Sequence, residues 1–60
     1  MANRVLAVDD DRDLLRMLTL ILQHAGYEVL PARSGNEALT ILGSEIPDIV
    51  LLDVMMPGMD

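Results

Sequence analysis

The chain has 60 residues, of which 52% are hydrophobic, and its ten acids and four arginines give a formal net charge of −6. This negative charge argues against nucleic acid or an anionic membrane as a partner of this segment. The absence of cysteine excludes disulfides and thiolate metal sites, and no apolar run approaches the roughly 20 residues of a membrane span, so we expect a cytoplasmic chain. A chain of this length has room for one domain at most.

The first predicted strand covers Val5 to Val8. Four aliphatic residues in succession are typical of a strand that is buried on both faces of a parallel sheet. The run ends abruptly at a pair of acids, Asp9 and Asp10. The sequence therefore predicts a buried strand with carboxylates at its carboxyl end.

A helix is predicted to follow, with Asp11 as its N-cap and Asp13 in its first turn, where both acids suit the positive end of the helix dipole. Gly26 is expected to end it in the left-handed conformation. One stripe of the helix is apolar and is expected to pack against the sheet: Leu14, Leu15, Met17, Leu18, Ile21, Leu22 and Ala25.

The second predicted strand, Tyr27 to Ala32, contains Pro31, which cannot donate to a ladder and therefore predicts an edge strand. A second helix is predicted after it, because Ser34 and Glu37 have the spacing of a capping box. This helix is short and is expected to end near Gly43.

The third predicted strand, Ile49 to Leu52, is again aliphatic at successive positions, which is typical of a central strand. The order strand, helix, strand, helix, strand predicts two right-handed crossovers. With the second strand at an edge, the strand order is 2-1-3 and the helices leave on opposite faces. The first and third strands then meet at a topological switch point, where open α/β sheets bind ligands.

Asp53 follows the third strand as Asp9 and Asp10 follow the first, so all three acids are expected at one edge of the sheet. Three close carboxylates repel one another and favour a bound cation. Oxygen ligands alone suit Mg²⁺ or Mn²⁺, and an aspartate beside such an ion is a competent phosphoryl acceptor. An acid after a strand also serves as a turn or cap residue, so the residues alone leave the structural and functional interpretations open.

Four features follow one another along the chain: the acid pair after the first strand, GYEV, SGNEAL and PDIVLLDVMMPGMD. In this order and spacing they resemble the amino-terminal half of a bacterial two-component response regulator receiver domain. The resemblance covers essentially the whole chain, so residues 1–60 are interpreted as that half. It implies a flavodoxin-like (CheY-like) doubly wound parallel sheet in α/β architecture, present here as an incomplete βαβαβ half with strand order 2-1-3.

The resemblance also implies roles for individual residues. Asp53 matches the phosphoryl acceptor, and Asp9 and Asp10 match acids that hold Mg²⁺ directly or through water. Met55 matches the position whose backbone carbonyl completes the protein ligands of the metal, and Pro57–Gly58 match the adjacent turn. The implied partner is a sensor histidine kinase or a phosphotransfer protein, and the implied role is a phospho-accepting signalling domain rather than an enzyme.

Two features depart from the family pattern. The Ser or Thr after a fourth strand and the Lys after a fifth have no counterpart in these 60 residues, so we expect the piece alone not to be fully competent. The third strand is also left as an unpaired aliphatic edge, which is a template for pairing with another chain. One alternative interpretation is therefore a self-associating module that forms a homodimer through that edge.

A third interpretation is a haloacid-dehalogenase-like phosphohydrolase, in which an aliphatic strand ends in Asp-x-Asp. Asp9 and Asp11 have that spacing. Asp13 stands where that family has a small or hydroxyl residue, and this interpretation leaves Asp53 without a better explanation.

Overall fold

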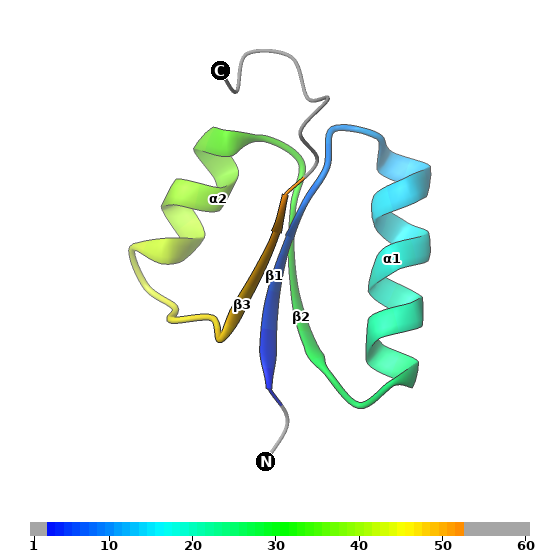
Figure 1. Cartoon of the computed structure of the whole chain (residues 1–60). Coiled ribbons are helices and arrows are strands. Elements are labelled where there is room, and N and C mark those ends of the chain that lie inside the picture. Colours follow the sequence, from blue (N-terminus) through cyan, green and yellow to red (C-terminus); the bar gives the residue numbers. More distant parts are fainter. Residues whose placement is uncertain (1–2, 53–60) are drawn as a thin grey trace.

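The computed structural model describes residues 3–52, which form a parallel sheet flanked by two helices (Figure 1). All the predicted elements are present, and their bounds are β1 Arg4–Val8, α1 Arg12–His24, β2 Glu28–Ala32, α2 Gly35–Leu42 and β3 Ile49–Leu52. The strand order is β2-β1-β3 and both pairings are parallel. The predicted order 2-1-3 is therefore confirmed.

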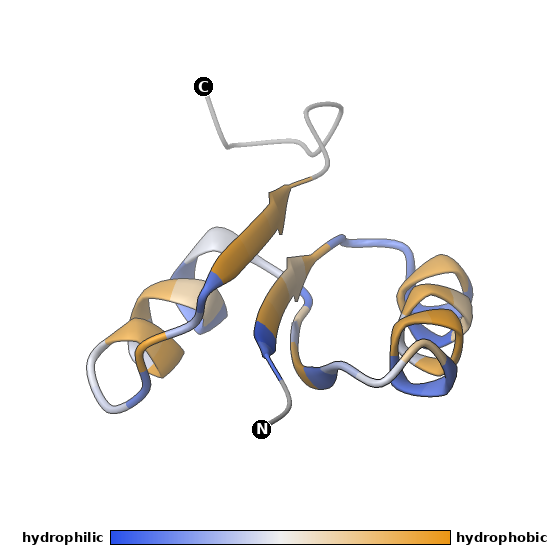
Figure 2. Cartoon of the chain, turned by 60° about the horizontal axis from the view of Figure 1, so that its bottom comes forward, coloured by the Kyte–Doolittle hydropathy of each residue, from blue (hydrophilic) through white to orange (hydrophobic). Residues whose placement is uncertain are grey.

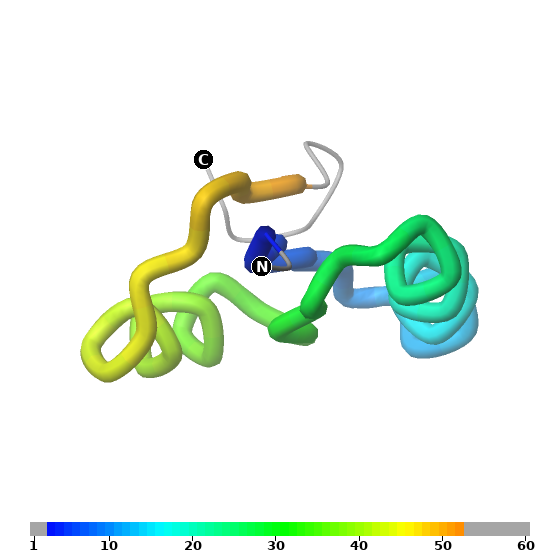
Figure 3. Tube along the Cα trace, turned by 90° about the horizontal axis from the view of Figure 1, so that it is seen from below, coloured from blue at the N-terminus to red at the C-terminus, as the bar shows by residue number. Residues whose placement is uncertain are grey.

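The two helices lie on opposite faces of the sheet, as the crossover argument predicts. Seen along the strands, β3, β1 and β2 form a row with α1 on one side and α2 on the other (Figure 3). β3 occupies the end of the row that is farther from both helices. This arrangement covers β1 and β2 and leaves β3 projecting.

β1 forms the centre of the core. Its residues 5–8 expose at most 3% of their surface, which confirms the prediction of a strand buried on both faces. On the α2 face, Leu6 and Val8 pack in one cluster with Ala32, Ala38, Leu30 and Ile41. Burying a leucine such as Leu6 stabilises the fold by about 1.5–3 kcal/mol.

Local signals define both ends of α1. The Oδ1 of Asp11 accepts hydrogen bonds from the N–H groups of Asp13 (3.0 Å) and Leu14 (3.1 Å), so the predicted N-cap is confirmed. After the C-cap Ala25, Gly26 adopts a φ of 98°. Glycine enters this left-handed region without the steric cost that a Cβ brings.

The capping of α2 differs in one detail from the predicted capping box. The Oγ of Ser34 accepts from the N–H of Glu37 at 3.1 Å, as expected. The Glu37 carboxylate, however, accepts from the N–H of Arg33 at 3.2 Å rather than from that of Ser34. The Glu37 carboxylate therefore binds the backbone of the residue before the N-cap. At its other end the helix stops at the C-cap Gly43, as predicted.

The prediction that the whole apolar stripe of α1 packs on the sheet was wrong. Leu15 is buried, but Leu14, Met17 and Ile21 expose 41%, 56% and 56% of their surface. The reason is that α1 packs against β1 and β2, and within residues 3–52 no Cα of either helix comes within 8 Å of a Cα of β3.

In the part of the chain that is described, neither helix is long and apolar enough to cross a membrane.

Candidate functional site

The carboxyl ends of β1 and β3 lie side by side at one edge of the sheet. Val8 and Leu52 are Cα partners in the last described pair of the β1–β3 ladder. Asp9 directly follows Val8, and Asp53 directly follows Leu52 in the sequence. Asp53 and Met55, like the Pro57–Gly58 turn, lie outside the described residues, so the predicted site is described only on its β1 side.

Asp9 is a buried carboxylate with 2% exposure. Its backbone N–H donates to the carbonyl of Ala32 (3.0 Å), which ties the end of β1 to the end of β2. Its Oδ1 accepts from the N–H of Asp11 at 2.9 Å. A charged group that is removed from water needs such partners, and these two bonds fix both the backbone and the side chain of Asp9.

The three consecutive acids after β1 separate into different environments. Asp9 is buried, Asp10 is exposed, and Asp11 caps α1. The cap interpretation of Asp11 is therefore confirmed, and capping accounts for this acid without the Asp-x-Asp phosphohydrolase, in which Asp9 and Asp11 would act together. Asp9 and Asp10 are the acids that remain available at this edge.

An apolar groove of about 290 Å³ opens beside Asp9. It lies between α1 and the end of β3. Its lining residues are Val8, Asp9, Leu14, Leu18, Leu51 and Leu52. The groove therefore lies next to the candidate site, at the carboxyl ends of β1 and β3.

Within residues 3–52, the structure brings no three His, Cys, Asp or Glu side chains into a group that could hold a metal ion. Asp9 and Asp10 supply oxygen donors only, which is the donor chemistry that Mg²⁺ and Mn²⁺ prefer. Two described acids plus water suit an open magnesium site, because Mg²⁺ usually keeps several of its waters. The residues present fit such an ion in donor type.

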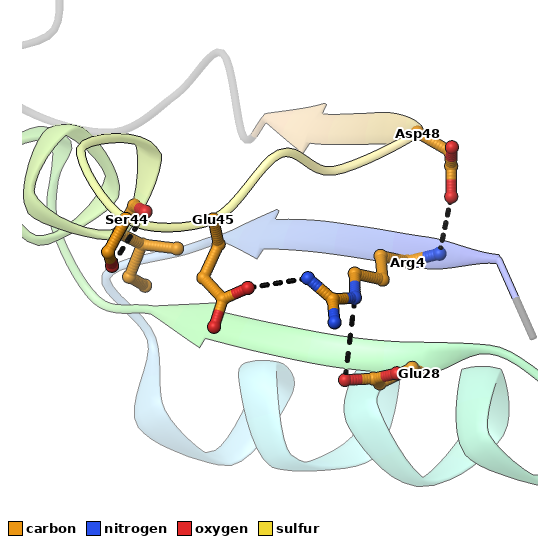
Figure 4. A network of polar contacts seen from close by, with 6 residues as sticks. Arg4, Glu28, Ser44, Glu45 and Asp48 are labelled. Atoms are coloured by element: carbon orange, nitrogen blue, oxygen red, sulfur yellow. Dashed lines mark hydrogen bonds and ion pairs between the residues drawn. The ribbon is translucent and has the colours of Figure 1, made fainter.

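The opposite end of the sheet carries a network centred on Arg4 (Figure 4). The Arg4 guanidinium pairs with Glu45 on the connection that leads to β3, and its Nε lies 3.7 Å from Glu28 Oε1 on β2. The Arg4 N–H donates to Asp48 Oδ2 at 2.8 Å. One side chain and its own backbone thus join β1, β2 and the start of β3.

Sequence reasoning missed these partners of Arg4. They are separated by as many as 44 positions in the chain, and no local pattern marks such a pair. The closest available signal is the position of Arg4 at the start of the first strand and of Asp48 at the start of the third. In a parallel sheet, two strand starts meet at the same edge.

The comparisons with known proteins agree with this geometry. The family model described as "Response regulator receiver domain" matches residues 5–60. The chain is 45% identical over 60 residues to the "DNA-binding response regulator MtrA" of Mycobacterium tuberculosis and of Mycobacterium leprae. All of this chain is matched, but it spans only 26% and 27% of the length of those curated relatives.

A solved structure supports the fold assignment. The chain superposes on the chemotaxis response regulator CheY4 of Vibrio cholerae with a TM-score of 0.91 and 42% identity. The match covers 98% of this chain and 49% of that one. The predicted flavodoxin-like (CheY-like) fold, present as an incomplete half, is therefore confirmed.

Proposed function

Because the chain belongs to the response regulator receiver domain family, we propose that it accepts a phosphoryl group on Asp53 from a histidine kinase or a phosphotransfer protein. Receiver domains are signalling domains of two-component systems. The donor is a phosphohistidine of the partner. An oxygen of the Asp53 carboxylate forms the new O–P bond while the P–N bond breaks, and the electron pair returns to the imidazole nitrogen.

One observation carries this proposal. The pairing of Val8 with Leu52 brings the end of β3, which Asp53 follows in the sequence, next to the end of β1, which the buried Asp9 follows. The hydrogen bonds of Asp9 and Asp11 fix the short connection from β1 to α1, and the Asp9 N–H ties the end of β1 to the end of β2. Asp9 is therefore held at the end of the strand that pairs with β3, and this supports the proposal because Asp53 directly follows β3 in the sequence.

We propose Asp9, Asp10, Asp53 and the backbone carbonyl of Met55 as ligands of Mg²⁺, or of Mn²⁺, directly or through water. When bound, such an ion offsets negative charge on the transferring phosphoryl group. The role of Asp9 is to present a carboxylate whose direction is set by the N–H of Asp11 at 2.9 Å. Asp10, which is exposed, supplies a second carboxylate from the solvent side.

The relatives carry "DNA-binding" in their names, but we assign no nucleic-acid contact to this segment, because its net charge is −6. The Ser or Thr and the Lys that the family uses around the phosphoryl group have no counterpart in residues 1–60. We therefore expect phosphoryl transfer to these residues alone to be weak. A cytoplasmic location remains a prediction.

The test is phosphorylation of a complete receiver domain that contains residues 1–60 by a small-molecule phosphodonor with Mg²⁺, followed by intact-mass spectrometry. We expect one added phosphoryl group that is acid-stable and labile to hydroxylamine, and we expect Asp53→Asn to abolish it. Asp13→Asn is the control, because Asp13 lies in the first turn of α1 and should label as the unmodified chain does. Undiminished labelling of Asp53→Asn would remove Asp53 from the acceptor role.

A second function is favoured by one specific observation. All the residues of β3 are aliphatic, yet Ile49, Val50, Leu51 and Leu52 expose 40%, 52%, 40% and 48% of their surface. An exposed apolar edge strand is a pairing surface for another chain. We therefore also propose that the 60-residue chain self-associates through β3.

A further inference from the structure

The connection from β1 to α1 links the Asp9 carboxylate to the start of the helix through Asp11. Figure 2 shows this connection as a hydrophilic segment between the hydrophobic strand β1 and α1. The N–H of Asp11 donates to Asp9 Oδ1 at 2.9 Å. The Oδ1 of Asp11 in turn accepts from the N–H groups of Asp13 and Leu14, at 3.0 and 3.1 Å. Asp11 therefore bonds to the candidate site on one side and to the first turn of α1 on the other.

The helix also fixes the backbone of Asp11. Its carbonyl accepts from the N–H of Leu15 at 2.9 Å, and Leu15 is the buried residue of α1. The extended backbone of Asp11, with φ −83° and ψ 110°, is typical of an N-cap residue whose side chain turns back onto its helix. The direction of the N–H that Asp11 donates to Asp9 is therefore set by α1 as well as by β1.

The Asp9 carboxylate depends on this bond for its orientation. Asp9 is 2% exposed, and within residues 3–52 the N–H of Asp11 is the only group that donates to its side chain. A hydrogen bond to an ionised acceptor is stronger than one between neutral groups. Partners that hold a metal-binding carboxylate in place typically change metal affinity about 10- to 100-fold when they are lost. A change in the position of the Asp11 N–H should therefore be felt by a cation bound to Asp9.

We propose that Asp11 is a positioning residue for the cation site. By capping α1 it holds the N–H that orients the Asp9 carboxylate, so the affinity of the site for Mg²⁺ depends on the first turn of α1. Coupling between two sites is reciprocal, and cation binding therefore stabilises that turn in return. The inference rests on the metal ligands proposed above and adds a residue that acts through Asp9.

The cap of α2 provides a matched control. The Oγ of Ser34 accepts from the N–H of Glu37 at 3.1 Å, and its carbonyl accepts from the N–H of Ala38 at 3.0 Å. Ser34 therefore caps α2 as Asp11 caps α1, but within residues 3–52 its hydrogen bonds all go to α2. A cap that acts only through overall stability affects the cation site equally from either helix, whereas a positioning residue acts from α1 alone.

Two substitutions of Asp11 separate capping from charge. Asp11→Asn and Asp11→Ala remove the same negative charge, but only asparagine keeps an oxygen that can accept from the first turn of α1. The measurement is an NMR titration with Mg²⁺ of a complete receiver domain that contains residues 1–60. We expect the dissociation constant of Asp11→Ala to be about tenfold higher than that of Asp11→Asn.

The control variant should lose stability without losing the cation. Ser34→Ala and Asp11→Ala each remove one N-cap acceptor, so we expect both to lower the melting temperature of the metal-free domain by similar amounts. Ser34→Ala should nevertheless bind Mg²⁺ as the parent does. If it weakened Mg²⁺ binding as much as Asp11→Ala, the positioning role of Asp11 would be wrong.

Hydrogen exchange of the unmodified domain tests the reciprocal effect, and it does not depend on whether Asp11→Ala folds. Saturating Mg²⁺ should slow exchange at the amides of Asp13 and Leu14, which Asp11 caps, more than at the amide of Glu37, which Ser34 caps. Equal slowing at both helices would indicate global stabilisation and would overturn the coupling.

These measurements separate the inference from the proposed phosphoryl transfer. Equal dissociation constants for Asp11→Ala and Asp11→Asn would overturn the role of Asp11 even in a domain that is phosphorylated on Asp53. Conversely, if Asp53→Asn were still labelled while the tenfold difference persisted, the acceptor assignment would fail and the role of Asp11 would stand. A domain that binds no Mg²⁺ would overturn both the proposed metal ligands and this inference.

Discussion

Arg4 and Asp48 are joined by two hydrogen bonds at the amino-terminal edge of the sheet. The Arg4 N–H donates to Asp48 Oδ2 (2.8 Å), and the Asp48 N–H donates to the Arg4 carbonyl (2.9 Å). This pair fixes where β3 starts relative to β1. A shift of one residue would turn every side chain of β3 to the opposite face, so the pair also determines which residue follows the strand at the acidic edge.

Removing the Asp48 carboxylate should destabilise the fold modestly. Asp48→Ala loses the acceptor for the Arg4 N–H, and we expect the free energy of unfolding to fall by about 1 kcal/mol, because the bond is exposed to water. Asp48→Asn keeps an oxygen at that position and should lose about half as much. Urea unfolding followed by circular dichroism measures both, and equal losses would show that charge rather than geometry matters.

Two leucines of α1 should respond very differently to truncation. Leu15 is 6% exposed and Leu20 is 60% exposed. Leu15→Ala should lower the free energy of unfolding by about 2–4 kcal/mol, whereas Leu20→Ala should change it by less than about 0.5 kcal/mol. Because both are the same substitution on one helix, helix propensity cancels in the comparison, and similar values would contradict the packing described.

Gly26 should resist substitution for a backbone reason alone. A Cβ built on it would meet no heavy atom within 4 Å, but its φ is 98°. Gly26→Ala should therefore cost about 1 kcal/mol of stability. Gly26→Asn should cost less, since asparagine tolerates left-handed conformations better, and thermal unfolding of the two variants gives the order.

Mg²⁺ should stabilise the unmodified chain more than a variant that lacks one site acid. At 100 times the dissociation constant, a ligand that binds only the folded state adds about 2.7 kcal/mol. Asp10→Asn should show less than half of this gain, and it should be at least as stable as the parent without metal because one repulsion is removed. Asp13→Asn is the control that should respond as the parent, and an equal response from all three chains would argue against a shared site.

The parts of the fold that could be predicted are those encoded by neighbouring residues. The helix bounds depend on local features, namely the N-cap hydrogen bonds of Asp11 and Ser34 and the left-handed backbone of Gly26. These features involve only residues a few positions apart, so the bounds of both helices followed from the sequence. Pro31 likewise placed β2 at an edge and thereby set the strand order. The position of Asp9 at the end of a buried strand followed from the aliphatic run before it.

The parts that could not be predicted depend on contacts between distant segments. An apolar stripe on α1 indicates that the helix can pack, but not how far across the sheet it reaches, so the exposure of Leu14 and Ile21 was missed. The partners of Arg4 have no local signal for the same reason. Asp53 and Met55 remain predictions, because they lie outside residues 3–52.

The proline on β2 also limits how large an assembly can grow. A sheet elongates into a fibre only when each added molecule exposes a further edge strand that can form ladder hydrogen bonds. In a dimer that is paired through β3, both outer edges would be β2 strands, where Pro31 has no N–H to donate. Association should therefore saturate at two molecules, so that a sample concentrated for days stays clear and does not bind amyloid dyes.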